Sequence, residues 1–267
     1  MKNILIIGGA GFIGSNITAK LADKGYNITI FDSLSVQVHG KKNKSSLYSS
    51  VKNIADVIIG DVCNKDDWGN ILSDKDAVIY LAAETGTAQS MYEIARYNQT
   101  NIIGLSNFYE HLTSSKNLVK KVIVASSRSI YGEGKYLCDE HGIVFPYYRK
   151  KSDLLNLDFN VKCPICNNDV KACATEEKAK IIPSSIYAIS KYQQEQIALL
   201  MGNTLDISTV ALRYQNVYGP GQSLTNPYTG ILSVFSTRIL NNNDIEIYED
   251  GCQSRDFVYI DDVVEGT

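Results

Sequence analysis

The sequence lacks the long apolar runs and the excess of positive charge that are typical of membrane proteins and of nucleic-acid-binding proteins. No run approaches the roughly 20 apolar residues of a transmembrane helix, and the N-terminal run at residues 4–7 is too short for a signal peptide. Lys and Arg number 26 against 29 Asp and Glu, which argues against nucleic acid as a partner. The one basic run, Lys41–Lys44, is short, and we expect a solvated loop there.

Six cysteines stand in a chain that shows no export signal. Such cysteines are usually free thiols in a reducing compartment, so we expect a cytoplasmic protein. Hydrophobic residues make up 44% of the 267 residues and charged residues 21%, which is ordinary for a folded globular chain. Disorder is therefore not expected.

Short, continuous apolar runs alternate with longer stretches of helical periodicity. The runs that fit buried parallel strands are residues 3–7, 27–31, 55–59, 77–82, 121–125 and 206–212. The stretches that fit helices are residues 12–24, 65–72, 89–113, 185–201 and 230–240. This alternation predicts an α/β protein with a doubly wound parallel sheet of the Rossmann type, whose ligands bind at the carboxyl ends of the strands.

Two regions interrupt the alternation and suggest domain boundaries. Residues 134–183 form a long irregular connection that carries several cysteines, and we interpret it as an inserted segment. It divides a dinucleotide-binding domain of residues 1–133 and 184–214. Residues 215–267 are expected to begin a smaller substrate-binding lobe. The sequence stops within a predicted helix just after Val264, so we expect this lobe to be truncated.

A glycine-rich motif separates the first predicted strand from the first helix. Its three regularly spaced glycines are Gly8, Gly11 and Gly14. This spacing permits a tight turn, close approach of a pyrophosphate and packing of helix on strand. The phosphates would lie on the helix N-terminus at Phe12 and Ile13, where free N–H groups favour anions. Asp32, at the end of the second strand, would bind an adenosine ribose and repel a 2′-phosphate, so the motif predicts NAD as the cofactor. The alternative is that the glycine motif is a turn that binds no ligand.

Two further strand ends add expected contacts to the same cofactor. Asp61 and Val62 follow the third strand and are candidates for the adenine edge, although Asp61 equally fits a capping role. Leu81, Ala82 and Ala83 follow the fourth strand, where small residues let a cofactor lie against the backbone. Both predictions place the cofactor along the carboxyl edge of the sheet.

Tyr187 and Lys191 form a candidate catalytic pair on a predicted helix. Residues at i and i+4 share one helix face, so the ammonium group can approach the phenol. A nearby cation lowers the pKa of a tyrosine, as a base that works near neutrality requires. Ser127, at the end of the fifth strand, would offer a hydroxyl to a substrate oxygen; a polar strand end without a role is the alternative.

With these motifs the sequence resembles the extended short-chain dehydrogenase/reductase superfamily, which includes the NAD-dependent nucleotide-sugar epimerases and dehydratases. The resemblance also covers residues 101–104, 212–220 and 255–258. The catalytic residues that it implies are Tyr187 as proton acceptor, Lys191 as its partner on the nicotinamide ribose, and Ser127. It further implies Asn101 at the cofactor, and Asn216 with Arg255 at the diphosphate of the substrate.

The residues after Ser127 favour epimerisation over elimination. Dehydratases of this superfamily carry an Asp-Glu pair there and a decarboxylase branch relies on Glu, whereas this sequence has Arg128 and Ser129. The sequence looks most like the dTDP-L-rhamnose 4-epimerase type. That resemblance implies a dTDP- or UDP-sugar as substrate, transient oxidation at C4 to a 4-keto sugar, rotation of the sugar, and re-reduction.

Several alternatives stay open at this stage. Thr87 and Gln89 lie where relatives contact the sugar, but each equally fits a helix cap. A homodimer through the helices at 89–113 and 185–201 is implied by the resemblance alone. Other candidate functions are a 4-ketoreductase or dehydrogenase with net redox turnover, a UDP-hexose 4-epimerase, and a regulatory protein that binds NAD without chemistry.

The cysteines of the inserted segment allow two interpretations. Cys163 and Cys166 have the Cys-x-x-Cys spacing, with Cys173 nearby and Cys138 or His141 upstream, so a four-ligand zinc site is conceivable. A single Cys-x-x-Cys without a second pair is a weak signal for zinc. We therefore expect reduced thiols and no metal, with zinc as the alternative.

Overall fold

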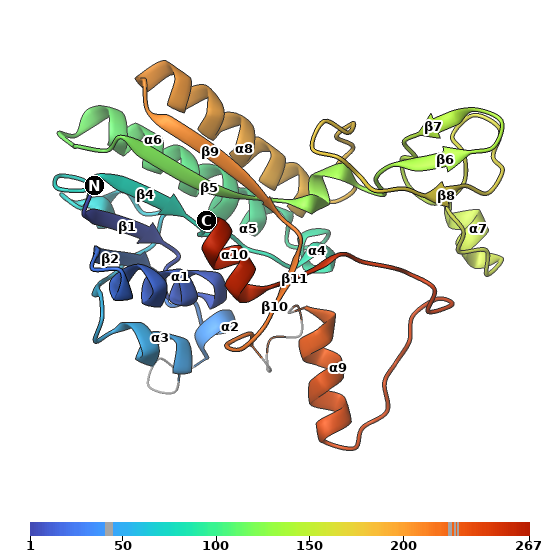
Figure 1. Ribbon diagram of the computed structural model, residues 1–267, viewed down its shortest axis with the longest axis horizontal. Coiled ribbons are helices and arrows are strands. Elements are labelled where there is room, and N and C mark those ends of the chain that lie inside the picture. Colours follow the sequence, from blue (N-terminus) through green and yellow to red (C-terminus); the bar gives the residue numbers. More distant parts are fainter. Residues whose placement is uncertain (41–44, 224–225, 227, 229) are drawn as a thin grey trace.

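A parallel sheet of six strands forms the centre of the molecule (Figure 1). The computed structural model describes residues 1–40, 45–223, 226, 228 and 230–267, so the expected loop at Lys41–Lys44 lies outside the described residues. The strands of this sheet are β1 (Asn3–Ile7), β2 (Asn27–Asp32), β3 (Asp56–Ile59), β4 (Ala77–Tyr80), β5 (Lys121–Ser127) and β9 (Ser208–Tyr214). Their order is β3-β2-β1-β4-β5-β9, with parallel neighbours throughout. The predicted doubly wound α/β fold is confirmed, and its strand order reverses between β1 and β4.

The strands bury side chains on both faces of the sheet, which explains why they form continuous apolar runs in the sequence. Leu5 of β1 belongs to a core on one face together with Phe108. The next residue, Ile6, belongs to the core on the other face together with Ile17. Both side chains of β1 are fully buried, so neither face of the sheet is left to solvent here.

Helices cover the two faces (Figure 1). On the near face lie α1 (Phe12–Asp23), α2 (Val36–His39), α3 (Ser46–Val51) and α10 (Ile260–Gly266). The far face carries α4 (Thr87–Ser90), α5 (Ile94–Tyr97), the π-helix η3 (Asn98–Ile103), α6 (Gly104–Ser114) and α8 (Ile186–Leu205). Within the described ranges, no helix is both long and apolar enough to cross a bilayer.

Two predicted helices differ from the structure. The helix expected over residues 89–113 is interrupted at residues 91–93, between α4 and α5, and then continues without a gap through α5, η3 and α6. In the widened turn of η3, the Asn101 side chain makes two hydrogen bonds with the backbone of Glu84. The helix expected over residues 65–72 is only the short 3-10 helix η2 (Lys65–Trp68). It ends at Gly69, which has a positive φ of 43° that a continuing helix does not allow.

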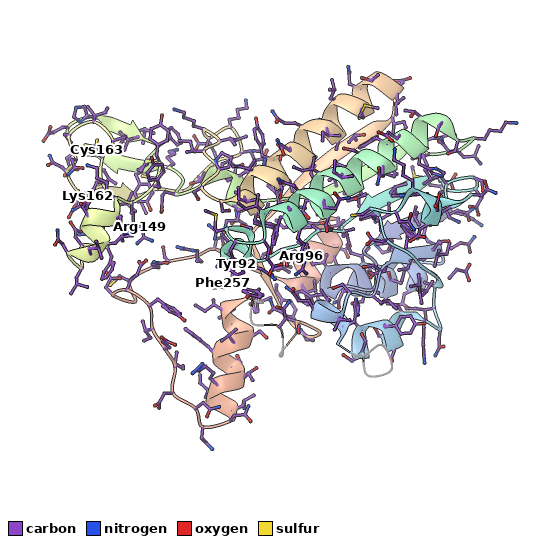
Figure 2. All side chains as sticks on the ribbon, turned by 180° about the vertical axis from the view of Figure 1, so that it is seen from behind. Tyr92, Arg96, Arg149, Lys162, Cys163 and Phe257 are labelled. Atoms are coloured by element: carbon purple, nitrogen blue, oxygen red, sulfur yellow. The ribbon has the colours of Figure 1, made fainter. Side chains whose placement is uncertain are left out.

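The inserted segment stands to one side of the sheet (Figure 1). It follows the short helix η4 (Arg128–Tyr131) and contains β6 (Tyr136–Cys138), β7 (Gly142–Val144), α7 (Lys151–Leu155) and β8 (Lys171–Ala172). The three strands form an antiparallel sheet in the order β7-β6-β8. Figure 2 shows Cys163, Lys162 and Arg149 on this unit, away from the central sheet.

The C-terminal region departs from the predicted domain boundary. Its elements are β10 (Asn216–Tyr218), α9 (Ile231–Leu240), β11 (Phe257–Tyr259) and α10, and β10 pairs with β11 in parallel. Helix α10 packs against α1: Ile260 and Val263 are buried, and Glu265 pairs with Lys20 at 2.8 Å. Residues 215–267 are therefore not one separate lobe, because the apolar face of α10 returns to the nucleotide-binding domain.

Candidate functional site

The glycine motif turns the chain from β1 into α1 at the carboxyl edge of the sheet. Gly8 has a φ of +80°, and a Cβ atom there would lie 2.7 Å from the backbone nitrogen of Ala82. A Cβ at Gly14 would lie 2.5 Å from the Gly8 carbonyl oxygen, so only glycine lets α1 pack this closely on the loop. Gly11 is the N-cap of α1 and brings no side-chain cap. The first N–H groups of α1 are thus left for an anion that approaches the loop.

Asp32 ends β2 beside this loop, and backbone donors fix its carboxylate. The Ala10 N–H donates to Oδ2 at 3.0 Å and the Leu34 N–H donates to Oδ1 at 2.8 Å. His39, which the sequence argument missed, is buried with its Nε2 3.8 Å from Asp32 Oδ1. Burial lowers the pKa of His39 although the Asp32 charge acts to raise it, so the ring is neutral at pH 7. A carboxylate beside a neutral ring accepts hydrogen bonds from ribose hydroxyls and repels a 2′-phosphate.

A cleft of about 610 Å³ runs along this edge of the sheet. The predicted site residues that line it are Gly8, Gly11, Phe12, Ile13, Gly14, Asp32, Asp61, Val62, Leu81, Ala82, Ala83, Thr87, Ser127, Tyr187, Lys191 and Asn216. The cleft thus joins the glycine loop to the tyrosine and lysine of α8. This juxtaposition follows from the parallel topology, which brings the carboxyl ends of the strands to one edge.

Asp61 combines the two roles that the sequence left open. Its Oδ1 accepts a hydrogen bond from the Cys63 N–H at 2.9 Å, so it caps its own turn. It also lines the cleft together with Val62, whose carbonyl oxygen accepts a bond from the Trp68 indole at 3.3 Å. The turn after β3 is therefore fixed by its own hydrogen bonds before any ligand binds.

Tyr187 lies in the first turn of α8, and capping determines where that turn begins. The hydroxyl oxygen of Ser185 accepts a hydrogen bond from the Ala188 N–H at 3.1 Å. The Tyr187 N–H donates to the Ser90 hydroxyl at 3.0 Å, which ties the start of α8 to α4. These bonds hold the tyrosine at the border of the cleft.

Ser127 stands at the end of β5 with its hydroxyl in a defined orientation. Its Oγ accepts hydrogen bonds from the N–H of Ser129 at 3.2 Å and from the Ser129 hydroxyl at 2.9 Å. Because Ser127 Oγ accepts both of these bonds, its own hydroxyl proton is available to donate to another group, and a substrate oxygen in the cleft is a suitable acceptor. Burial raises the pKa of Tyr187, and the Ser127 hydroxyl and the charge of Arg128 partly offset this effect.

Lys191 lies one turn further along α8 and is 3% exposed. Its Nζ donates to Gln194 Oε1 at 2.6 Å, and burial lowers its pKa to about 7. The sequence predicted that Lys191 lowers the pKa of Tyr187, and this stays a prediction. In this structure the Lys191 ammonium group turns along the helix to Gln194, and the charge of Arg128 acts to lower the pKa of Tyr187.

Arg128 is a cleft residue to which the sequence argument gave no role beyond the absence of an acid. Its guanidinium is half-buried, and burial, together with the charge of Arg255, lowers its pKa. None of the ion pairs formed among the described residues includes Arg128. A half-buried guanidinium in the lining of a cleft favours an anion beside it, and the oxygens of a phosphate group match its geometry.

The two predicted diphosphate residues differ in their placement. Asn216 lines the cleft, and its Nδ2 donates to the Asp256 carbonyl oxygen at 2.8 Å, which joins β10 to β11. Arg255 is exposed and does not line the cleft; its guanidinium donates to the Ser254 carbonyl oxygen and to Gln253 Oε1. In this structure Arg128, and not Arg255, lines the cleft.

Gln89 and Asn101, which were predicted as contacts of the sugar and the cofactor, are buried and do not line the cleft in this structure. The Gln89 amide donates to Glu93 Oε1 at 3.0 Å and so belongs to the packing of α4 and α5. Thr87, by contrast, lines the cleft, and Gly86 occupies the cap position. Asn101 donates to the Ser190 hydroxyl at 2.9 Å and also binds the loop after β4, so its amide group joins this loop to α8.

A buried ion pair holds α8 against the sheet. Glu195 of α8 accepts hydrogen bonds from Arg213 of β9 at 2.6 and 3.0 Å, a bidentate arrangement. The Ser126 hydroxyl, at the end of β5, donates to the same carboxylate at 2.7 Å. Three elements that border the cleft are therefore joined at one carboxylate. No motif in the sequence indicated a role for Glu195.

Comparison with known proteins agrees with this geometry. The family model described as "NAD dependent epimerase/dehydratase family" matches residues 4–151 and 167–267. The chain belongs to this family. The match omits residues 152–166 of the inserted segment, so this epimerase/dehydratase carries a stretch there that the family model lacks.

Relatives and solved structures of this family cover nearly all of the chain. A dTDP-L-rhamnose 4-epimerase of Burkholderia thailandensis is 35% identical over 99% of this chain and 71% of its own length. A putative UDP-glucose 4-epimerase of Methanocaldococcus jannaschii is 31% identical over 98% of this chain and 71% of its own. The crystal structure of a Thermotoga maritima UDP-glucose 4-epimerase with UDP-glucose has a TM-score of 0.75 and 30% identity, covering 98% of this chain and 71% of that one.

The cofactor of the family is NAD, and the cleft of this epimerase/dehydratase fits it. A Bacillus cereus UDP-glucuronic acid 4-epimerase, solved with NAD, has a TM-score of 0.76 and 26% identity, covering 99% of this chain and 71% of that one. In this chain the glycine loop provides the cradle that a Cβ atom would fill, and the uncapped start of α1 provides donors for a pyrophosphate. Asp32 is fixed where an adenosine ribose would lie.

Proposed function

We propose that the protein is a nucleotide-sugar 4-epimerase of the dTDP-L-rhamnose 4-epimerase type. The observation that carries the proposal is the single cleft in which Tyr187, Lys191 and Ser127 lie beyond the glycine loop. The 35% identity to the Burkholderia thailandensis enzyme favours a dTDP-linked deoxysugar among the possible substrates. The unpaired Arg128 guanidinium is suited to bind the diphosphate that every such substrate carries.

The chain's own residues supply proton transfer and charge stabilisation. Tyr187 Oη takes the proton of the sugar 4-hydroxyl, and the Ser127 hydroxyl donates a hydrogen bond to the same oxygen as its charge develops. When bound, NAD supplies a nicotinamide ring that accepts hydride from C4 and returns it to the opposite face. After the 4-keto sugar has turned in the cleft, Tyr187 Oη returns the proton to the oxygen. The configuration at C4 is inverted with no net redox change.

The side chains after Ser127 support epimerisation over elimination. Removal of a C5 proton and expulsion of water need an acid and a base next to the sugar. Position 128 holds a guanidinium group, and the Ser129 hydroxyl donates a hydrogen bond to the Ser127 hydroxyl. Neither group is able to remove a proton from carbon at neutral pH.

Dimer formation and a cytoplasmic location are part of the same proposal. Several large apolar side chains are exposed on the helices of the expected dimer face: Ile94 of α5, Ile103 of η3, and Ile189, Leu199 and Leu200 of α8. Exposed apolar side chains gathered on neighbouring helices are typical of protein interfaces. All six cysteines are free thiols, as expected in a reducing compartment.

Proton NMR of the protein incubated with NAD⁺ and dTDP-L-rhamnose tests the proposal. Inversion moves H4 from an axial to an equatorial position, so its large couplings to H3 and H5 become small. We expect this change with no accumulation of reduced cofactor. Net reduction of NAD⁺ would instead indicate a dehydrogenase. An unchanged spectrum with dTDP-L-rhamnose, while a UDP-hexose is epimerised, would contradict the deoxysugar assignment alone.

A further inference from the structure

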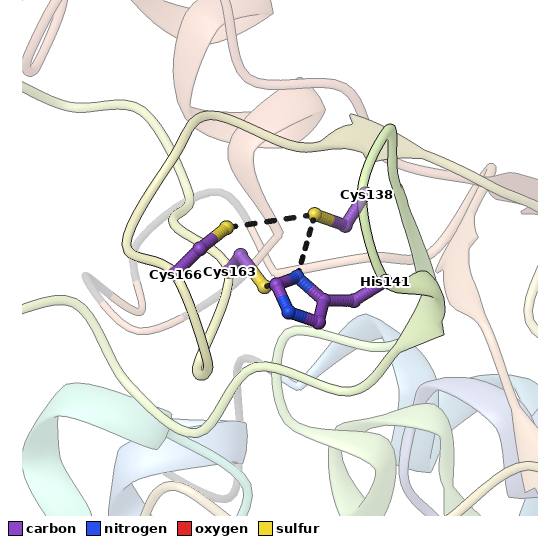
Figure 3. A group of neighbouring side chains, drawn as sticks. All are labelled: Cys138, His141, Cys163 and Cys166. Carbon is purple, nitrogen blue, oxygen red and sulfur yellow. Dashed lines mark hydrogen bonds between the residues drawn. The ribbon is translucent and has the colours of Figure 1, made fainter.

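Four side chains that are able to bind a metal converge in the inserted segment, outside the cleft (Figure 3). They are Cys138, His141, Cys163 and Cys166, and their ligand atoms all lie within 4.8 Å of one another. Cys138 Sγ lies 3.7 Å from Cys166 Sγ and 3.6 Å from His141 Nδ1, and Cys163 Sγ lies 3.8 Å from the same nitrogen. Cys173 does not belong to this group; its thiol donates to the Lys171 carbonyl oxygen.

The three separations just given match edges of a zinc tetrahedron. With Zn–S distances of about 2.3 Å and Zn–N distances of about 2.0–2.1 Å, tetrahedral angles put two sulfurs about 3.8 Å apart and a sulfur and a nitrogen about 3.6 Å apart. The observed sulfur pair differs from that edge by a tenth of an ångström, and the sulfur–nitrogen pairs differ by two tenths or less. A Cys₃His set that converges in this way is typical of structural zinc.

The backbone places each pair of ligands at the tip of a hairpin. In the first hairpin Cys138 of β6 pairs with Gly142 of β7, and His141 lies in the turn between them. The second hairpin is closed by hydrogen bonds on both sides of the Cys-Pro-Ile-Cys sequence: the Cys163 N–H donates to the Asn168 carbonyl oxygen at 2.8 Å, and the Val170 N–H donates to that of Val161 at 3.2 Å. Each tip therefore presents two ligands separated by two residues.

The turn of the second hairpin is also shaped around a thiolate. The Ile165 N–H donates to Cys163 Sγ at 3.5 Å, so a backbone dipole points at the sulfur. Asn167 adopts a φ of +65° and donates its N–H to the Cys163 carbonyl oxygen at 3.0 Å, which bends the chain back toward the sulfurs. Backbone donors at sulfur stabilise the charged form, which is the form that binds metal.

Apolar packing within the segment is too small to fix this arrangement. The buried members of its local core are Cys138, Val144 and Cys163, and two of these three are ligands. Units of this size usually depend on disulfides or a metal, and all six cysteines are free thiols. A bound cation would join the two hairpins at the point where apolar contacts are fewest.

We propose that Cys138, His141, Cys163 and Cys166 bind one Zn²⁺ ion in a structural site. Four protein ligands complete the tetrahedron and leave no open position for substrate, so the ion has no part in the chemistry. Its role is to fix the two hairpins with respect to each other. Arg149 lies in the chain between the two hairpins (Figure 2). It forms an ion pair with Glu249 at 2.6 Å, which connects the inserted segment to the chain before β11.

Metal analysis of the purified full chain and of two cysteine variants tests this assignment. The protein is produced in zinc-containing medium, dialysed against a weak chelator and analysed for zinc, iron and free thiols. We expect close to one zinc per chain in the wild type and in Cys173→Ser, and less than a tenth of that in Cys163→Ser. Cys173→Ser is the matched control, because it removes a cysteine of the same segment that lies outside the group. NAD binding, measured on each variant, reports whether the central domain is folded.

A second variant keeps the test decisive if Cys163→Ser does not fold. His141→Cys replaces nitrogen by sulfur and should retain one zinc per chain. In cobalt-substituted protein it should increase the thiolate-to-metal charge-transfer absorption of a tetrahedral site by about one third, from three thiolates to four. Wild-type protein with six titratable thiols and no zinc, with iron in place of zinc, or with a Cys138–Cys166 disulfide would overturn the proposal.

Discussion

At the scale of single residues, the proposed chemistry depends most directly on Tyr187, which lines the cleft together with Ser127. Tyr187→Phe removes the proton carrier and leaves the ring in place. We expect turnover to fall by about 10²–10⁴-fold, the usual contribution of a positioned acid or base, with NAD binding unchanged. Tyr192→Phe is the control, because Tyr192 lies on the same helix but packs in an apolar cluster. Activity retained in Tyr187→Phe would remove this residue from the mechanism.

Lys191 leads to a prediction about stability and pH. Burial lowers its pKa in the folded state to about 7, whereas the unfolded chain has the ordinary value of 10.5. Between these values the unfolded state binds more protons, so the free energy of unfolding rises with pH there. Below pH 7 the folded protein bears the full cost of a buried ammonium group. Lys191→Met, in the absence of NAD, should therefore be stabilised at pH 6, and its advantage should shrink as the pH approaches 10.

Urea unfolding of both proteins at pH 6, 7, 8 and 9 measures this difference. Lys116→Met removes an exposed lysine and should give a difference that does not change with pH. If the Lys191→Met difference were equally flat, the buried ammonium would have to be compensated by a group other than Gln194.

At the scale of elements, the Glu195–Arg213 pair should dominate the attachment of α8 to the sheet. Breaking a largely buried, bidentate pair leaves a charge without its partner, so Arg213→Met is expected to lower the free energy of unfolding by about 3 kcal/mol. The double variant Glu195→Met/Arg213→Met should be less destabilised than the single one, because no lone charge is left buried. Lys20→Met, which breaks an exposed pair with Glu265, should cost less than about 1 kcal/mol. Chemical denaturation of the wild type and the three variants compares these values.

The strands and helices of the structure can be compared with those that the sequence predicted. The strands were predicted within a few residues because both faces of the sheet are buried and their apolar runs are continuous, as in β1 at Asn3–Ile7. The interruption at residues 91–93 and the widened turn of η3 were not predicted, and the Asn101 side chain in η3 makes its hydrogen bonds with Glu84 and Ser190, outside its own helix. Side-chain hydrogen bonds of this kind leave no periodic signal.

For the site, residues held by backbone geometry were predicted better than residues held by side chains. The glycine loop and Asp32 follow from local rules, and they line the cleft. The sequence did not predict that Arg128 lines the cleft and that Arg255 is exposed, because the exposure of a guanidinium depends on tertiary packing. In the inserted segment, the Cys-x-x-Cys spacing was visible, but the choice of Cys138 and His141 over Cys173 required the pairing of β6 with β7.

At the scale of the whole molecule, the apolar side chains exposed on η3 and α8 should determine the oligomeric state. Leu200 is 65% exposed and Ile103 43%, on helices of the same face of the sheet. A dimer would remove such side chains from water, and a charge placed among them would remain buried without a partner. Leu200→Glu is therefore expected to convert a dimer into a monomer at micromolar concentration, as measured by light scattering after gel filtration. Leu155→Glu introduces the same charge at a 73% exposed position on α7 and should leave the dimer intact. A wild-type monomer, or a dimer unaffected by Leu200→Glu, would show that copies of the chain do not associate through this face.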